Sequence, residues 1–127
     1  MRGQDEGSSS VLFAQLAALL VVVAALLAGF GAVLSAQQQA QGVADMAALA
    51  GADRSSVAAY ALDGDGDGPC RAASEVAQAN GFSLGFCEVR GSDTFVEVSR
   101  GLGVFLGAFT VSAKARAGPP ASFTGSE

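Results

Sequence analysis

The chain has 127 residues, a formal net charge of −5, and neither histidine nor tryptophan. Its apolar beginning leaves room for at most one small water-soluble domain. The few Lys and Arg residues are scattered, so the sequence lacks the basic stripe that neutralises nucleic-acid phosphates, and we expect no nucleic-acid partner. Without histidine the chain lacks the commonest general base and zinc ligand, so we expect no enzyme activity and no cofactor.

Residues 1–10 form a polar leader, and residues 11–36 form an apolar run without a charged side chain. About 20 apolar residues in a helix cross a bilayer, so this run predicts a single transmembrane helix. A cleaved signal peptide is the alternative, although its apolar stretch is usually only about 7 to 15 residues long and ends in a small-x-small site. The best such site here, Leu34-Ser35-Ala36, has leucine where a small residue is preferred.

The basic residues suggest an orientation for this helix. Arg2 precedes the apolar run, and the next basic residue is Arg54. The positive-inside rule then favours a cytoplasmic N-terminus and an extracytoplasmic C-terminal part in the cell membrane.

Eight alanines follow one another at a spacing of four residues. Small residues at this spacing let a second helix approach closely in lipid, which predicts self-association through an alanine-rich helix. A general excess of alanine explains the same pattern, so both interpretations stay open. The row consists of Ala24, Ala28, Ala32, Ala36, Ala40, Ala44, Ala48 and Ala52.

Residues 37–62 contain no proline and predict that the helix continues outside the membrane. A stripe of small side chains suits packing against another helix or against the protein's own sheet. Gly42 and Gly51 weaken the helix, so a bend or an end near either is expected. The stripe comprises Ala36, Ala40, Val43, Ala47 and Ala50, opposite Gln37, Gln38, Gln41 and Asp45.

The segment "AQGVADMAALAGA", residues 40–52, directly follows the apolar helix. It resembles the signature after the membrane helix of TadE-like and TadG-like proteins of Flp pilus assembly, and the whole chain resembles the small actinobacterial TadE-like group. The resemblance implies a pseudopilin-like, non-catalytic membrane protein whose partners are other pilus-assembly or secretion proteins. The signature residues are Ala44, Asp45, Ala47, Ala48, Leu49 and Ala50.

Pilin-type leaders are cut after a glycine, and the mature protein has glutamate at its fifth position. Gly7 is the candidate cleavage site here, which places Leu12 at that fifth position. The resemblance therefore carries an expectation of leader cleavage at Gly7 but not of ordinary pilin polymerisation.

The stretch "ALDGDGDGPC" interrupts the helical pattern. Asp63, Asp65 and Asp67 match the first half of a calcium-binding loop, whereas Ser74 stands at the twelfth position, where the loop requires glutamate. A flexible Asp/Gly linker over residues 63–69 is the simpler interpretation. Calcium binding stays open.

Residues 70–118 predict a small α+β domain. A helix begins at Pro69, with Asp67 or Gly68 as its cap, and ends at Asn80-Gly81. Strands 83–90 and 94–100 form a hairpin through residues 91–93, and a third strand covers 108–117. Its inward side chains are Phe109, Val111, Ala113, Ala115 and Ala117.

Two further segments complete the chain. The apolar stretch 101–109 fills space beneath the helix, touches the membrane surface or contacts a partner, with packing as the default. Residues 119–127 are an expected disordered tail.

Cys70 and Cys87 are the chain's two cysteines. An even count in a small exported domain favours a disulfide joining helix to sheet, and two buried reduced thiols are the alternative. Such a bond stabilises by about 3 kcal/mol in the chain-entropy model.

The fold class predicted from these elements is α+β: a long N-terminal transmembrane helix extended outside the membrane, then a short helix on a three-stranded antiparallel sheet. The predicted function is a membrane-anchored structural component of a pilus-assembly or secretion apparatus. A membrane-tethered or secreted extracellular binding domain is the alternative.

Overall fold

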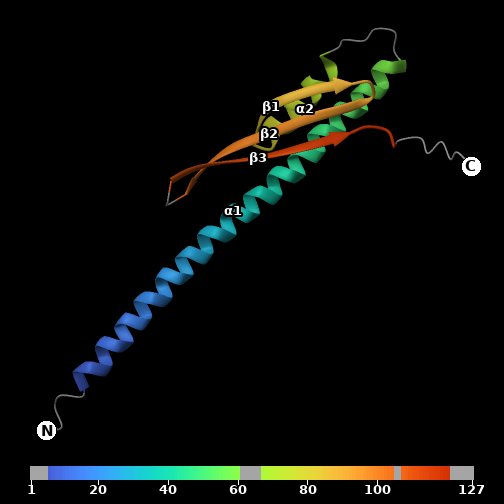
Figure 1. Ribbon diagram of the computed structural model, residues 1–127. Coiled ribbons are helices and arrows are strands. Elements are labelled where there is room, and N and C mark those ends of the chain that lie inside the picture. Colours follow the sequence, from blue (N-terminus) through green and yellow to red (C-terminus); the bar gives the residue numbers. More distant parts are fainter. Residues whose placement is uncertain (1–5, 61–66, 105–106, 121–127) are drawn as a thin grey trace, which may run out of the picture. The chain divides into compact units, whose positions relative to one another are not determined.

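The computed structural model describes residues 6–60, 67–104 and 107–120. The elements, in chain order, are α1 (Glu6–Tyr60), α2 (Gly68–Ala79), β1 (Ser83–Arg90), β2 (Asp93–Val104) and β3 (Gly107–Ala117) (Figure 1). The α+β prediction is confirmed as a long apolar N-terminal helix, a short helix and a three-stranded antiparallel sheet. The chain divides into two compact units, Met1–Ser35 and Ala36–Glu127.

The first unit contains only the N-terminal part of α1. None of its described residues is buried. Val33 is half-buried, and the other large apolar side chains of this unit are exposed within the protein: Val11, Leu12, Phe13, Leu16, Leu19, Leu20, Val21, Val22, Val23, Leu26, Leu27, Phe30 and Leu34.

The sheet in the second unit has the strand order β1-β2-β3, and both pairings are antiparallel. Arg90 pairs with Asp93, so the β1–β2 turn has two residues, Gly91 and Ser92, and Asp93 belongs to the strand and not to the expected turn. Gly91 has φ +64°, as the first position of a type II′ hairpin turn requires. Glycine is suited to this position because it adopts positive φ without steric cost.

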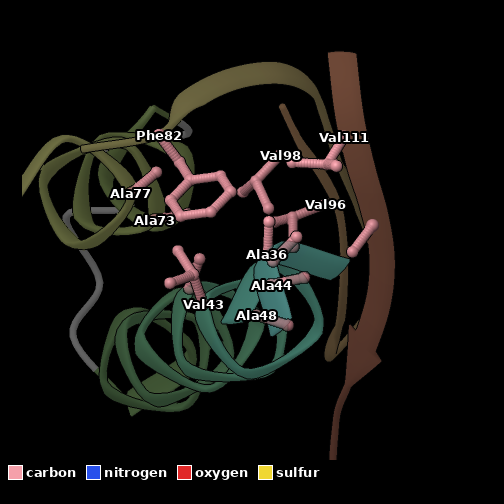
Figure 2. Close-up of a cluster of buried hydrophobic side chains, with 13 residues drawn as sticks. Ala36, Val43, Ala44, Ala48, Ala73, Ala77, Phe82, Val96, Val98 and Val111 are labelled. Atoms are coloured by element: carbon pink, nitrogen blue, oxygen red, sulfur yellow. The ribbon is translucent and has the colours of Figure 1, made fainter. Parts of the chain in front are cut away.

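One face of the sheet carries α2 and the part of α1 that begins at Ala36, and their side chains meet in a single core (Figure 2). The predicted stripe on α1 is confirmed, because four of its five residues are buried and Ala50 is half-buried. The stripe packs against the protein's own sheet, which was one of its two interpretations. The core consists of Ala36, Ala40, Val43, Ala44, Ala47, Ala48, Ala73, Ala77, Phe82, Val96, Val98, Val111 and Ala113.

Helix α1 continues through both Gly42 and Gly51 to Tyr60, so the expected helix end at either glycine is wrong. A β-carbon at Gly51 would lie only 2.6 Å from Thr94 Cγ2, whereas one at Gly42 would meet nothing within 4 Å. Gly51 is therefore explained by the close approach of α1 to β2 and not by helix termination.

Helix α2 begins and ends as its sequence predicts. Asp67 precedes it without a side-chain capping bond, and Pro69 occupies its first turn. At the other end, the Asn80 N–H donates to the Ala77 carbonyl at 3.1 Å, and Gly81 takes φ +76°. This positive φ reverses the chain and sends it into β1.

The third strand is confirmed over most of its length. Val111 and Ala113 are buried, and Ala115 and Ala117 are half-buried, as the alternation predicts. Phe109 is 47% exposed, so its predicted burial is wrong. The reason is that Ser83, the first residue of β1, already pairs with Ser99, and the β2–β3 hairpin continues beyond that point to the pair Val104 and Gly107.

The stretch 101–109 is therefore mainly the end of a hairpin. Gly101, Gly103 and Ala108 are exposed, and Leu102 is half-buried. The default expectation of packing holds for Leu102, which packs against the core. It is wrong for Gly101, Gly103 and Ala108, because the hairpin extends beyond the first residue of β1. Residues 105 and 106 lie outside the described residues.

Candidate functional site

The signature residues of α1 divide between two faces of the helix. Ala44, Ala47 and Ala48 are fully buried, and Ala50 is half-buried. Their small side chains allow the helix backbone to approach the sheet closely, as the packing at Gly51 shows. This half of the signature forms part of the protein's own core.

The other half of the signature points away from the core. Leu49 is 62% exposed, and Asp45 beside it on the helix surface is also exposed. Met46 and Val57 are further large apolar side chains exposed on the same helix. We call Asp45, Met46, Leu49 and Val57 the outward face of α1. Exposed apolar side chains gathered on one element are typical of a contact surface.

The alanine row is partly used inside the protein. Ala36, Ala40, Ala44 and Ala48 are buried in the core, and Ala52 is half-buried. Ala24, Ala28 and Ala32, in the first unit, are exposed. Any contact of the row with a second helix therefore belongs to these three alanines.

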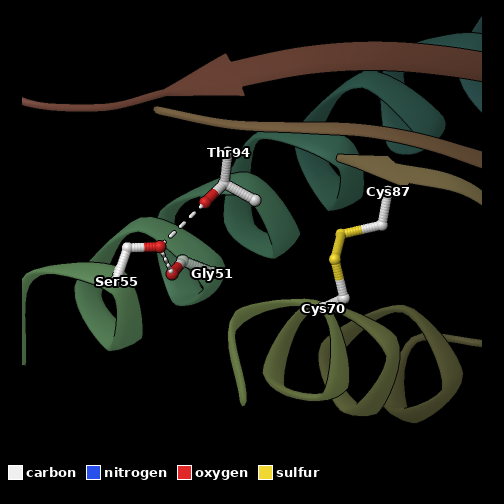
Figure 3. Close-up of a disulfide and its surroundings, with 5 residues drawn as sticks. All are labelled: Gly51, Ser55, Cys70, Cys87 and Thr94. Carbon is white, nitrogen blue, oxygen red and sulfur yellow. Dashed lines mark hydrogen bonds between the residues drawn. A yellow bond between two sulfur atoms is a disulfide. The ribbon is translucent and has the colours of Figure 1, made fainter. Parts of the chain in front are cut away.

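The disulfide between Cys70 and Cys87 is present and joins α2 to β1 (Figure 3). Their Cα atoms lie 5.8 Å apart. Cys87 pairs with the buried Val96 in the sheet, so the bond ties α2 to the core-facing side of β1.

Ser55 and Thr94 form a small polar contact beside Gly51. The Ser55 hydroxyl donates to the Gly51 carbonyl at 3.0 Å, and its oxygen lies 3.4 Å from Thr94 Oγ1 (Figure 3). Both side chains are buried, so the contact satisfies polar atoms that would otherwise be costly in the core. Its geometry indicates a structural role.

Two glutamines of α1 bind the edge of the sheet. Gln37 Nε2 donates to the Ser112 carbonyl at 2.9 Å, and Gln41 Nε2 donates to the Lys114 carbonyl at 3.2 Å. Because β3 is an edge strand, these bonds occupy backbone acceptors that an added strand would otherwise use. The sequence shows two glutamines one helical turn apart, but their partners lie more than seventy residues away and carry no recognisable signal.

The face of the sheet away from the helices is charged. The guanidinium groups of Arg90 and Arg116 both lie 5.3 Å from the centre of the Phe95 ring. Arg90 also donates to Glu88 at 2.8 and 2.9 Å, which holds the pKa of that carboxyl below its ordinary value. The side chains of Arg90 and Glu88 are 67% and 39% exposed, so their ion pair contributes little to stability.

The candidate calcium ligands are mostly outside the structure's description. Asp63 and Asp65 lie in residues 61–66, which are not described, and Asp67 is exposed at the start of α2. Within the described residues, no group of three or more acidic, cysteine or histidine side chains is placed to hold a metal ion.

A surface pocket of about 230 Å³ lies between α1 and the start of α2. Arg54, Arg71 and Glu75 contribute its charged groups, together with Gly68 and Ala72. This lining offers no nucleophile paired with a base, so it does not assemble a site for covalent catalysis.

Gly7 is the second residue of α1. A β-carbon at Gly7 would have no neighbouring atom within 4 Å. Between Gly7 and Val57, α1 is long and apolar enough to cross a membrane, and its most apolar window has no buried residue. A signal sequence near an N-terminus has the same two properties.

The chain matches no protein-family model, no curated protein and no solved structure.

Proposed function

We propose that the protein is a non-catalytic, membrane-anchored structural component of a pilus-assembly or secretion apparatus, as its resemblance to TadE-like and TadG-like proteins implies. The observation that carries this proposal is the division of α1. Its first part exposes large apolar side chains with no core of their own, and its later part combines a packed inner face with an outward face.

Lipid is the environment that suits the first part of α1. Leucine, valine and phenylalanine side chains exposed around a helix are unfavourable in water and favourable in hydrocarbon. The backbone of a helix is fully hydrogen-bonded internally, as a membrane-spanning segment requires. A single pass through the cell membrane therefore accounts for this segment.

The disulfide supports the proposed orientation. Structural disulfides persist in oxidising compartments outside the cytoplasm. The bond between Cys70 and Cys87 therefore favours an extracytoplasmic second unit and, with one membrane pass, a cytoplasmic N-terminus.

The outward face of α1 is the proposed contact surface for partner proteins. Met46 and Leu49 supply exposed apolar area, and Asp45 adds a charge that limits which partners fit. By pseudopilin-like we mean that a membrane helix continues into a contact surface and that a sheet packs on the continued part of the helix.

Photo-crosslinking in the native cells tests this proposal. A photoreactive amino acid at Leu49 should give discrete adducts with membrane or secretion-apparatus proteins or with a second copy of the chain. The same group at Gln78, exposed on α2, is the matched control and should give none. Identical adducts from both positions, or none from Leu49, would contradict the proposed contact surface.

A secreted or membrane-tethered binding domain is the second candidate. It is favoured by the boundary between the two compact units, which falls at Ser35 and Ala36, within the best signal-peptidase-like site. Cleavage after Ala36 would remove Ala36 and leave every other residue of the core in one piece. N-terminal sequencing of the mature protein separates this candidate from the anchored component.

A further inference from the structure

The end of the β2–β3 hairpin is an exposed apolar element that the proposed contact surface does not include. From Gly101 to Ser112 the sequence carries no charge. Leu102 pairs with Phe109 across the two strands, so their side chains lie on the same face of the sheet. Phe109 is nearly half exposed, whereas Leu102 is half-buried and packs against the core, so Phe109 is the main exposed apolar side chain of the pair.

Two hydrogen bonds fix the direction in which this hairpin end points within the second unit. Gln41 binds the carbonyl of Lys114, and Gln37 binds that of Ser112. Moving from Gln41 to Gln37 leads toward the beginning of the unit at Ala36, and the same direction along β3 leads from Lys114 toward Gly107. The hairpin end therefore extends past Gln37, on the side where the unit begins. It also extends beyond the first residue of β1 (Figure 1).

The length of this extension exceeds the thickness of a membrane interface. From Ser112 to Gly107 a strand covers about 17 Å, at about 3.3 to 3.4 Å per residue. The headgroup layer on one side of a bilayer is only about 5 to 8 Å thick. In the sequence, the apolar run ends at Ala36 and the glutamines begin at Gln37, so the bilayer surface belongs at this level if α1 crosses the membrane.

We propose that the described end of the β2–β3 hairpin, residues 101–104 and 107–110, contacts the lipid interface of the same bilayer that anchors α1, with Phe109 and the exposed part of Leu102 against lipid. This proposal rests on the proposed membrane anchor. In this proposal the second unit contacts the membrane through the hairpin as well as being attached to it through α1.

The chemistry of the hairpin fits lipid. Apolar and aromatic side chains at an interface typically sink about 5 to 10 Å into the boundary between headgroups and acyl chains. The described strands pair with each other from Leu102 with Phe109 to Val104 with Gly107, and the backbone groups on the two open edges of this hairpin can bind water and headgroups at the interface. The nearest charged residues along the strands, Arg100 and Lys114, stand outside the uncharged segment.

Fluorescence quenching by lipid tests the proposal, because the chain has no tryptophan of its own. The full chain carrying Phe109→Trp is reconstituted into vesicles of phosphatidylcholine and phosphatidylglycerol, with and without brominated phosphatidylcholine. Phe30→Trp, in the apolar part of α1, reports on the anchor itself. Val57→Trp, on α1 about 30 Å beyond Gln37 at about 1.5 Å per residue, is the control that should remain in water.

The expected result is that brominated lipid quenches Phe109→Trp by a fraction comparable to Phe30→Trp and leaves Val57→Trp unchanged. Quenching of Phe30→Trp alone would overturn the hairpin proposal and leave the anchor standing. No quenching of Phe30→Trp would contradict the anchor and, with it, the hairpin contact. Circular dichroism and an intact disulfide in each variant verify that the protein is folded.

Discussion

At Gly51, α1 approaches β2 and α2 so closely that a single added carbon cannot fit without movement. A β-carbon there would lie 2.6 Å from Thr94 Cγ2 and 3.2 Å from the Pro69 carbonyl oxygen. Thr94 is fully buried and is held by its contact with Ser55, so it has little freedom to move aside. The absence of a side chain at Gly51 therefore allows α1 to pack closely against both β2 and α2.

Gly51→Ala should destabilise the second unit although alanine favours a helix. Overpacking a core costs about 1 to 3 kcal/mol, which outweighs the gain of about 1 kcal/mol in helix propensity. Gly42→Ala is the matched control, since a β-carbon at Gly42 meets nothing within 4 Å, and it should be neutral or stabilising. Thermal unfolding of the full chain in detergent measures both. Equal stability of the two variants would contradict the packing at Gly51.

The signature residues should separate into structural and contact residues when they are mutated. Ala48→Leu places a large side chain at a fully buried position and should destabilise by about 1 to 3 kcal/mol. Leu49→Ala, next to it on the exposed side, should change stability by less than about 0.5 kcal/mol. The same unfolding measurement compares them. A strongly destabilised Leu49→Ala would mean that this side chain belongs to the core.

At the scale of elements, the disulfide is the main covalent link within the second unit. It closes a sequence separation of 17 residues between α2 and β1. Replacing both cysteines by alanine should lower the free energy of unfolding by about 3 kcal/mol, because the unfolded chain regains the freedom of this loop. Unfolding of the double variant measures the loss. Alkylation of both thiols in native, unreduced protein would contradict the bond.

Most elements could be predicted because their signals are local. Four-and-three spacing identified the buried side of α1, Pro69 and Gly81 marked the limits of α2, and period-two alternation identified the strands. The side chains of Val111 and Ala113 point inward as that alternation requires.

The failures came from contacts between distant elements. In the sequence, Gly51 resembles a helix-breaking residue. The reason for a glycine there is the close contact with Thr94 on β2, which the sequence does not show. Phe109 continues the inward pattern of β3, but the sequence of β3 does not show that β1 begins only at Ser83, opposite Ser99 of β2. The partners of Gln37 and Gln41 could not be predicted for the same reason.

At the scale of the whole molecule, the two units account for different parts of the proposed function. The first supplies apolar surface without a core, and the second supplies a disulfide-linked core with exposed apolar side chains at the outward face of α1 and at the hairpin end. The candidate contact residues could be predicted only in part. The resemblance indicates Asp45 and Leu49, and the apolar stretch 101–109, which contains Phe109, has membrane or partner contact among its expected roles. Met46 has no such signal in the sequence and is a candidate only because it is exposed.

The most direct test of membrane anchoring is N-terminal sequencing of the mature protein combined with carbonate washing of the membrane fraction. We predict that the protein stays in the washed membranes and begins at Met1, or at Ser8 if the leader is cut after Gly7, because either form keeps the apolar part of α1. A soluble protein that begins near Gln37 would contradict the account, since the apolar run would then be a discarded signal sequence.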